Sequence, residues 1–304
     1  MDERRVGVGA GLGAYVVWGV FPLYFPLLEP AGGLEIVAHR VAWSLLFIAL
    51  LLTVRRGWGQ VRATVADRRA LLVLAAAAGL IAINWLVYVY AVNSGHVVES
   101  SLGYFINPLV SVVLGVAVFR ERLRRLQWVA VGLAVLAVVV LTVDHGRPPW
   151  IALTLATSFG SYGLMKKLVR VEAAPGLLVE TALVFVPALV VIGVLEAHGN
   201  AAFGDAGVGN AFLLVSTGLA TAVPLLLFAA AANRVPLSTI GLLQYVTPLI
   251  QLAIGVYVFD EPMPPARLAG FVIVWLALAV FTADSLRQAR STRRATASPV
   301  AVGV

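Results

Sequence analysis

Long apolar segments, divided by short stretches of turn-forming or charged residues, fill almost the whole chain. Ten such segments lie at about residues 6–28, 35–54, 70–92, 97–119, 126–143, 149–168, 176–195, 210–232, 237–258 and 266–285. Each approaches the roughly 20 apolar residues that a helix needs to cross a bilayer. The pattern therefore predicts an all-α membrane protein with ten transmembrane helices. Residues 286–304 lack apolar periodicity and are rich in Ser, Thr, Ala and Arg, which predicts a disordered cytoplasmic tail.

The apolar pattern repeats itself at an offset of 140 residues. When residues 86–144 are compared with 226–284, sixteen of the 59 aligned pairs are identical without a gap, and they include Asn, Pro, Phe, Glu and Asp. A repeat of this length in so apolar a chain indicates a duplicated membrane bundle, with one five-helix repeat at 1–145 and a second at 146–285. Because five is an odd number of spans, the second repeat enters the bilayer from the opposite face and is inverted relative to the first.

Composition indicates a bilayer rather than water around most of the chain. Of the 304 residues, 61% are hydrophobic and 12% are charged, whereas a soluble domain carries about 25% charged residues. Ten spans with short loops leave no room for a soluble catalytic domain. The absence of cysteine excludes disulfides, thiolate metal sites and thiol nucleophiles. A net charge of +7 often indicates nucleic-acid binding, but no nucleic-acid partner is expected here, because the placement of the charges has another explanation.

Basic residues gather on one side of the predicted membrane. If the N-terminus is inside and the spans alternate, 19 of the 22 Lys and Arg residues fall in inner regions, as the positive-inside rule requires. Both termini are therefore predicted to be cytoplasmic. The chain also runs from Met1 through charged residues straight into an apolar segment with no small-residue cleavage site, which predicts a first membrane helix instead of a removed signal peptide.

Charged side chains near the outer ends of two spans are candidates for gating or ion coupling, because such groups are costly in a membrane. Glu35 and His39 lie one helical turn apart at the start of the second span, and Arg40 follows them. His96 and Glu99 open the fourth span at a similar predicted depth. We expect Arg40 and Glu99 to pair near the outer mouth with the other three nearby. The alternative is that all of them are solvated in the interface; no strong metal-binding motif is present.

A second group of charges lies near the inner ends of spans six and seven. Either Lys166 or Lys167 can pair with Glu180, which falls one turn inside an apolar segment. Lys167 is explained more simply as an ordinary inner anchor of its span. We therefore expect Lys166 and Glu180 to belong to the gating or coupling group.

Two prolines, Pro108 and Pro248, occupy matching mid-span positions in the two repeats. Proline removes a helical hydrogen bond and kinks or breaks the helix, so each is a predicted bending point. The preceding Asn107 and Thr247 can satisfy freed backbone groups or face a cavity; the alternative is a purely architectural kink. Polar and aromatic residues predicted to line a substrate site together with Asn107 are Trp18, Tyr24, Asn84, Tyr88, Tyr104, Tyr162, Gln244 and Tyr245.

Several stretches resemble the EamA group of the drug/metabolite transporter superfamily. They are residues 14–25, 35–44, 158–167 and 242–248, and the longest is 84–108, with the sequence NWLVYVYAVNSGHVVESSLGYFINP. The resemblance implies ten spans in two inverted repeats, cytoplasmic termini, and a multi-pass permease or exporter in the bacterial inner membrane.

The same resemblance implies a central cavity between spans 1, 3, 4, 6, 8 and 9, with spans 5 and 10 at the periphery. The candidates on spans 1, 3, 4, 6 and 9 agree with this arrangement. Arg40 and Glu180 lie on spans 2 and 7, so the resemblance places them in gating or structural positions rather than in direct contact with substrate.

Together these features predict a secondary transporter that moves a small metabolite or drug by alternating access. Glu99 with His96 could carry a coupling proton, and exchange or facilitated diffusion fits the sequence equally well. No cofactor and no catalytic residue is expected. Two alternatives stay open, an intramembrane enzyme that uses His96 and Glu99 and a membrane scaffold without transport. The substrate, the direction of transport and the oligomeric state are left open.

Overall fold

The computed structural model describes residues 3–120, 123–169, 171–232, 234–235 and 237–297. All regular elements in these ranges are helices, with no strand among them. Among the described residues, seven helices are long and apolar enough to cross a membrane, and an eighth span results if one bent pair of helices is counted as a single span. The prediction of an all-α membrane protein is confirmed.

The helices fall into two compact units by their contacts. One unit comprises residues 1–111 and 150–262, and the other comprises 112–149 and 263–304. The helices of the first unit are α1 (Glu3–Gly19), α2 (Phe21–Tyr24), η1 (Phe25–Leu28), α3 (Gly33–Val54), α4 (Trp58–Ala66), α5 (Arg68–Asn93), the first part of α6 (Val97–Phe119), α8 (Trp150–Val169), α9 (Ala173–Ala197), α10 (Gly207–Ala232), α11 (Leu237–Leu243) and α12 (Val246–Tyr257).

The second unit is built around a pair of helices, α7 (Arg125–His145) and α13 (Pro265–Ala297), which pack against each other. Helix α13 continues to Ala297, so residues 286–297, predicted to be disordered, are helical instead. Ala, Arg, Leu and Gln in this stretch have high helix propensity, which extends the helix after the apolar pattern ends. The last residues of the predicted tail, 298–304, lie outside the described part of the chain.

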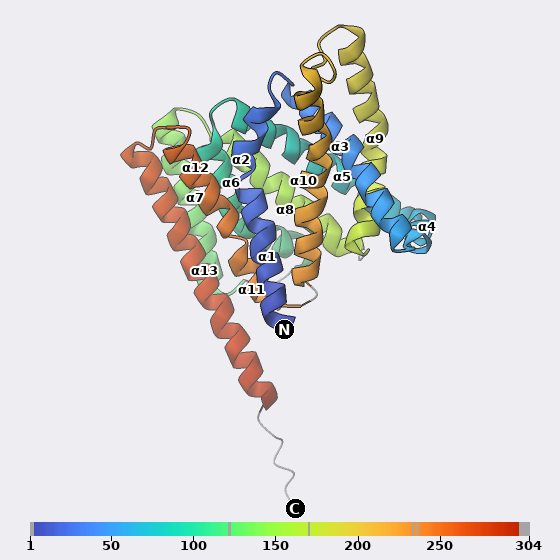
Figure 1. The fold of residues 1–304 in the computed structure, drawn as a ribbon. Helices are drawn as coiled ribbons and strands as arrows, with labels where there is room; N and C mark the ends of the chain where they lie inside the picture. The colour runs from blue at the N-terminus through green and yellow to red at the C-terminus, as the bar shows by residue number, and fades with distance from the viewer. Residues whose placement is uncertain (1–2, 121–122, 170, 233, 236, 298–304) are drawn as a thin grey trace, which may run out of the picture. The chain divides into compact units, whose positions relative to one another are not determined.

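Within the first unit, three packing relationships position the candidate residues. Helix α3 lies against α9 and α10, α5 lies against α8 and α9, and α1 lies against α10 and α12 (Figure 1). Phe25, Ile36, Val89 and Leu155 are buried in one apolar cluster that joins several of these helices. The charged or polar residues discussed below therefore come from helices whose backbones are fixed by apolar packing.

The α3–α10 contact depends on a glycine. A Cβ atom on Gly218 would lie 2.6 Å from the backbone carbonyl carbon of Trp43, closer than atoms can pack without a shift of a helix. Small residues at helix contacts are the usual means by which membrane helices approach closely. The two backbones can therefore stay at this separation only with glycine at position 218.

We expect Gly218→Ala to lower the free energy of unfolding in detergent by about 1–3 kcal/mol, because the added methyl group overpacks the α3–α10 contact. The matched control is Gly79→Ala, since a Cβ on the exposed Gly79 of α5 meets no atom within 4 Å. This control should be neutral or more stable by up to about 1 kcal/mol, from the gain in helix propensity. Equal stability of Gly218→Ala and wild type would contradict the close contact.

Two of the apolar segments are interrupted rather than continuous. Helix α1 and the pair α2–η1 are bent by 44°, and both short helices carry a proline near their start, Pro22 and Pro26. The predicted span at 237–258 is split into α11 and α12 at Gln244 and Tyr245. Proline is tolerated in the first turn of a helix, where its missing N–H has no helical partner. Pro22 and Pro26 at the first break, and Pro248 at the second, all lie in the first turn of a helix, which explains the position of both breaks.

The structure agrees with the prediction of a kinked or broken helix at one of the two paired prolines. Pro248 is the third residue of α12, directly after the helix break at Gln244 and Tyr245. Pro108 lies inside the continuous helix α6. The two matching prolines thus occupy different helical contexts in the structure.

Candidate functional site

A buried amide connects three helices of the first unit. The side chain of Asn84, on α5, is 1% exposed. Its Nδ2 donates hydrogen bonds to the Leu155 carbonyl at 3.1 Å and to the Ser158 Oγ at 3.0 Å, both on α8. Its Oδ1 accepts a hydrogen bond from the Tyr104 hydroxyl of α6 at 3.3 Å. Because an unpaired polar group is costly inside a membrane protein, these bonds hold the three helices in one arrangement.

The same polar network extends to α12 through a second amide. Gln251 Nε2 donates to the Tyr88 hydroxyl at 2.8 Å and to the Trp18 carbonyl at 3.3 Å. The Tyr88 and Tyr104 rings meet edge to face with their centroids 5.7 Å apart. Gln251 Oε1 is buried and has no hydrogen-bond partner among the described residues. Five helices, α1, α5, α6, α8 and α12, thus contribute polar groups to one buried network, in which the Tyr88–Tyr104 ring contact connects two sets of hydrogen bonds.

Arg40 is buried among aromatic rings near this network. It is 5% exposed, and its Nε donates a hydrogen bond to the Thr221 Oγ1 of α10 at 2.7 Å. The guanidinium carbon lies 4.3 Å from the centroid of the Trp85 ring and 5.4 Å from that of Phe21. These are cation–π distances, at which the ring faces attract the charge.

The predicted ion pair between Arg40 and Glu99 is wrong. Glu99 Oε1 instead accepts the backbone N–H of Ile151 at 3.0 Å, at the start of α8. The first N–H groups of a helix have no partner within the helix and attract carboxylates. In the described ranges, no hydrogen bond or ion pair joins His96 to Glu99. The His96 Nδ1 lies 3.0 Å from the Ser94 Oγ instead. The predicted outer cluster is therefore divided.

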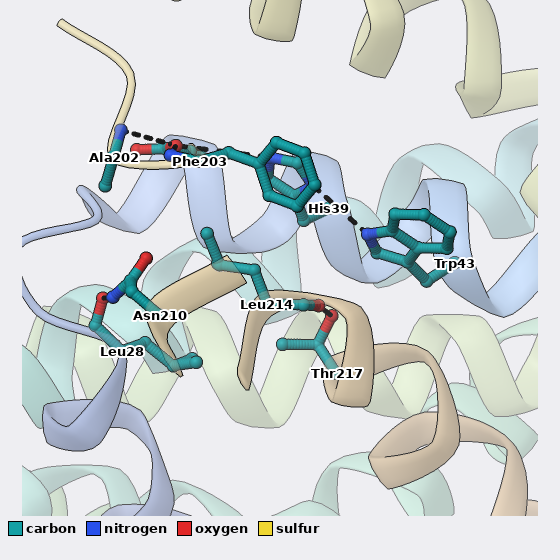
Figure 2. A network of polar contacts seen from close by, with 9 residues as sticks. Leu28, His39, Trp43, Ala202, Phe203, Asn210, Leu214 and Thr217 are labelled. Carbon is teal, nitrogen blue, oxygen red and sulfur yellow. Dashed lines mark hydrogen bonds and ion pairs between the residues drawn. The ribbon is translucent and has the colours of Figure 1, made fainter. Parts of the chain in front are cut away.

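Glu35 and His39 do lie together, and Figure 2 shows His39 with Trp43, Ala202 and Phe203 around it. Glu35 Oε1 accepts the N–H groups of Ala202 and Phe203 at 2.8 and 3.0 Å. The His39 ring stacks on Phe203 with centroids 4.6 Å apart and accepts a hydrogen bond at Nδ1 from the Trp43 indole at 3.2 Å. His39 Nε2 is 4.0 Å from Glu35 Oε1. This contact within α3 confirms the one-turn spacing predicted from the sequence. The bonds of Glu35 and the stacking of His39 on Phe203 join the N-terminal end of α3 to the segment before α10.

The second predicted charge pair is confirmed. Lys166 Nζ lies 2.6 Å from Glu180 Oε1, and the Tyr162 hydroxyl donates to Glu180 Oε2 at 3.1 Å. The Glu180 side chain is 1% exposed and that of Lys166 is 23% exposed. Both carboxylate oxygens are therefore satisfied by groups of α8, which fixes α8 against α9.

The remaining predicted lining residues are distributed around these groups. The Tyr24 hydroxyl contacts the Leu213 carbonyl at 2.9 Å and the Ser216 Oγ at 2.7 Å, both on α10. Asn107 is 3% exposed, and its Oδ1 has no hydrogen-bond partner in the described part of the chain. Gln244 and Tyr245 are half-buried at the break between α11 and α12. All of them belong to the first unit, but no hydrogen bond among the described residues joins Gln244 to the buried network.

Comparison with known proteins places the chain in a family. The model of the EamA-like transporter family matches residues 5–143. "Protein RarD" of Streptomyces exfoliatus is 53% identical over 96% of this chain and 93% of its own length. The chain belongs to the EamA-like transporter family. "Uncharacterized transporter YojE" of Bacillus subtilis and "Protein RarD" of Escherichia coli are 41% and 39% identical, each over 96% of this EamA protein. The resemblance predicted from the sequence motifs is confirmed.

A solved structure extends the comparison to the fold. One crystal structure with 17% sequence identity superposes with a TM-score of 0.58 and covers 94% of this EamA protein and 99% of that chain, which shows a common fold over almost the full length. With its apolar helices and its transporter relatives, this EamA protein is a multi-pass bacterial membrane protein and a membrane transporter of the drug/metabolite type.

Among the buried polar residues of this EamA protein that were not sequence candidates, three join separate segments. Gln251 joins α12 to Tyr88, and Thr221 holds Arg40. Glu261 accepts the N–H groups of Val97 and Val98 at the start of α6. The sequence contains a feature that could have identified two of them. Gln251 lies one helical turn after Thr247 in an apolar segment, and Glu261 belongs to one of the identical pairs of the internal repeat.

Proposed function

We propose that this EamA protein is a secondary transporter that moves a small metabolite or drug across the bacterial inner membrane by alternating access. The observation that carries the proposal is the buried network that runs from Gln251 through Tyr88 and Tyr104 to Asn84. Burying polar groups among apolar membrane helices costs free energy, and such groups usually serve a substrate or ion pathway. The network draws on five helices, as a site at the centre of a helical bundle would.

The proposal includes ten spans in two inverted five-helix repeats with both termini cytoplasmic. Two helical segments besides the seven to eight apolar spans support this number. Helix α8 has 20 residues, and α11 with α12 fills the predicted ninth span. The bent α1–α2 segment also packs against the broken α11–α12 segment, and discontinuous helices of this kind form the substrate sites of many transporters built from inverted repeats.

The proposed function is tested by uptake in proteoliposomes that contain the purified protein. A panel of metabolites and antibiotics is offered outside, and the compound inside is recovered and identified by mass spectrometry. Saturable accumulation of an unchanged compound, absent from protein-free vesicles, is the expected result. Recovery of a chemically altered compound would indicate an intramembrane enzyme, and the absence of protein-dependent flux across the panel would contradict transport.

The contact of Glu99 with the start of α8 predicts that this carboxylate is structural. We expect Glu99→Gln to retain any proton flux that accompanies substrate uptake, because the amide oxygen can still accept the Ile151 N–H. The measurement is substrate-driven pH change in proteoliposomes with an entrapped pH-sensitive dye. Loss of proton flux with retained substrate flux would contradict the structural role and assign a coupling role to Glu99.

A further inference from the structure

Arg40 is a buried cation with no carboxylate partner among the described residues. Its one hydrogen bond in that part of the chain is the bond from Nε to Thr221, so the two terminal nitrogens of the guanidinium have no protein acceptor there. Lys166 provides the comparison within the same unit, because its ammonium group lies 2.6 Å from Glu180. A cation inside a membrane protein ordinarily pairs with an anion or faces a pathway.

The two glutamates that the sequence groups with Arg40 accept hydrogen bonds from backbone N–H groups elsewhere. Glu35, on the same helix, accepts the N–H groups of Ala202 and Phe203. Glu99 accepts the N–H of Ile151. Because both carboxylates already accept hydrogen bonds from backbone N–H groups, neither depends on Arg40 as a donor. The terminal nitrogens of Arg40 therefore stay available to donate two parallel hydrogen bonds.

The groups in contact with Arg40 are neutral, and they connect it to the proposed transport network through packed aromatic rings. The Trp85 and Phe21 rings lie against the guanidinium. Phe21 packs edge to face on Phe25, which in turn packs edge to face on Tyr88. Tyr88 also connects to Gln251, whose buried Oε1 has no partner among the described residues. An uncompensated cation and an unused acceptor thus lie at two points of one connected set of side chains.

We propose that Arg40 receives the carboxylate of the transported compound, so that the substrate of this protein is a small organic acid. The proposal rests on the proposed transport function and adds the substrate class to it. The anchored Nε and the flanking Trp85 and Phe21 rings fix the plane of the guanidinium, while its terminal nitrogens stay available for two-point binding of a carboxylate. Gln251 Oε1 then accepts a hydrogen bond from a hydroxyl or amino group of the same compound. Arg40 becomes a substrate-binding residue, although it lies on the second span.

The test uses sets of compounds that differ in one group. Phenylacetate, phenylacetamide and phenethylamine form one set, and hexanoate, hexanamide and hexylamine form another. Binding to the purified protein is measured by quenching of tryptophan fluorescence and by the shift of the thermal unfolding midpoint. We expect saturable binding for carboxylates and at least tenfold weaker binding for the matching amides and amines. Equal binding of an amide or amine, or no binding of either carboxylate, would overturn the proposal.

Variants of Arg40 connect the binding to this side chain. Arg40→Gln is expected to weaken carboxylate binding at least tenfold, and Arg40→Lys to weaken it less, because the charge is kept and the two-point geometry is lost. The matched control is Arg62→Gln, which removes the same charge from an exposed position on α4 and should bind carboxylates like wild type. Unchanged carboxylate binding by Arg40→Gln would overturn the proposal.

A second variant keeps the test valid if Arg40→Gln does not fold. Thr221→Val retains the arginine and removes the partner of its Nε, so carboxylate binding should weaken severalfold while amide binding stays the same. An equal change for carboxylate and amide would count against the proposal. Uptake assays separate this inference from the proposed function, because protein-dependent flux of neutral or cationic compounds alone would overturn the organic-acid substrate and leave transport intact, whereas no flux of any compound would contradict transport itself.

Discussion

Lys166→Met is expected to lower the free energy of unfolding by about 3 kcal/mol, because it leaves the carboxylate of Glu180 buried without its cation. The Glu180 side chain is 1% exposed, and its ammonium partner lies 2.6 Å away. Tyr162 would remain as a single neutral donor. The measurement is reversible unfolding of the purified protein in mixed detergent micelles.

The double variant Lys166→Met with Glu180→Gln should recover most of that loss, because no uncompensated charge remains in the apolar contact between α8 and α9. The control Arg62→Met removes a positive charge from an exposed position on α4 and should change stability by less than about 0.5 kcal/mol. A Lys166→Met variant as stable as this control would show that the pair contributes nothing to the fold.

The second large effect is expected on transport. Asn84→Ala removes the donor to Leu155 and Ser158 and the acceptor of the Tyr104 hydroxyl in one step. We expect the initial rate of uptake to fall about tenfold or more. This fall corresponds to a rise of at least about 1.4 kcal/mol in the free-energy barrier for uptake. Tyr104→Phe, which removes the hydroxyl and keeps the ring, should give a smaller loss.

The control for this prediction is Thr157→Ala. Thr157 is the neighbour of Ser158 on α8, but it is exposed and its hydroxyl bonds only within its own helix, to Leu153 and Thr154. Uptake by this variant should match wild type at equal protein density in the vesicles. If Asn84→Ala also transports like wild type, the buried network does not form the substrate pathway.

Local features of the fold could be predicted from the sequence because they depend on neighbours along the chain. The apolar segments predict the helices, and the one-turn spacing of Glu35 and His39 predicts their contact. The pairing of Lys166 with Glu180 was also predicted, since both fall near the ends of consecutive spans joined by a short loop. In each case, the period of the helix or a short connection limits the possible partners.

The features that the sequence did not predict depend on contacts between distant segments. Glu99 pairs with the start of α8 because free N–H groups of a helix compete for its carboxylate, and the sequence alone does not show which helix start lies beside it. Arg40 meets Thr221, which is 181 residues away.

The inverted repeat is tested most directly by two positions that the repeat makes equivalent. Ser94 and Arg234 are separated by the repeat offset of 140 residues, both are exposed, and the chain has no cysteine of its own. Single Ser94→Cys and Arg234→Cys variants can therefore be labelled with a membrane-impermeant maleimide in intact cells and in inside-out vesicles. Inverted repeats predict labelling of position 94 from the periplasmic side and of position 234 from the cytoplasmic side. Labelling of both positions from the same side would contradict the inverted arrangement and the transport mechanism built on it.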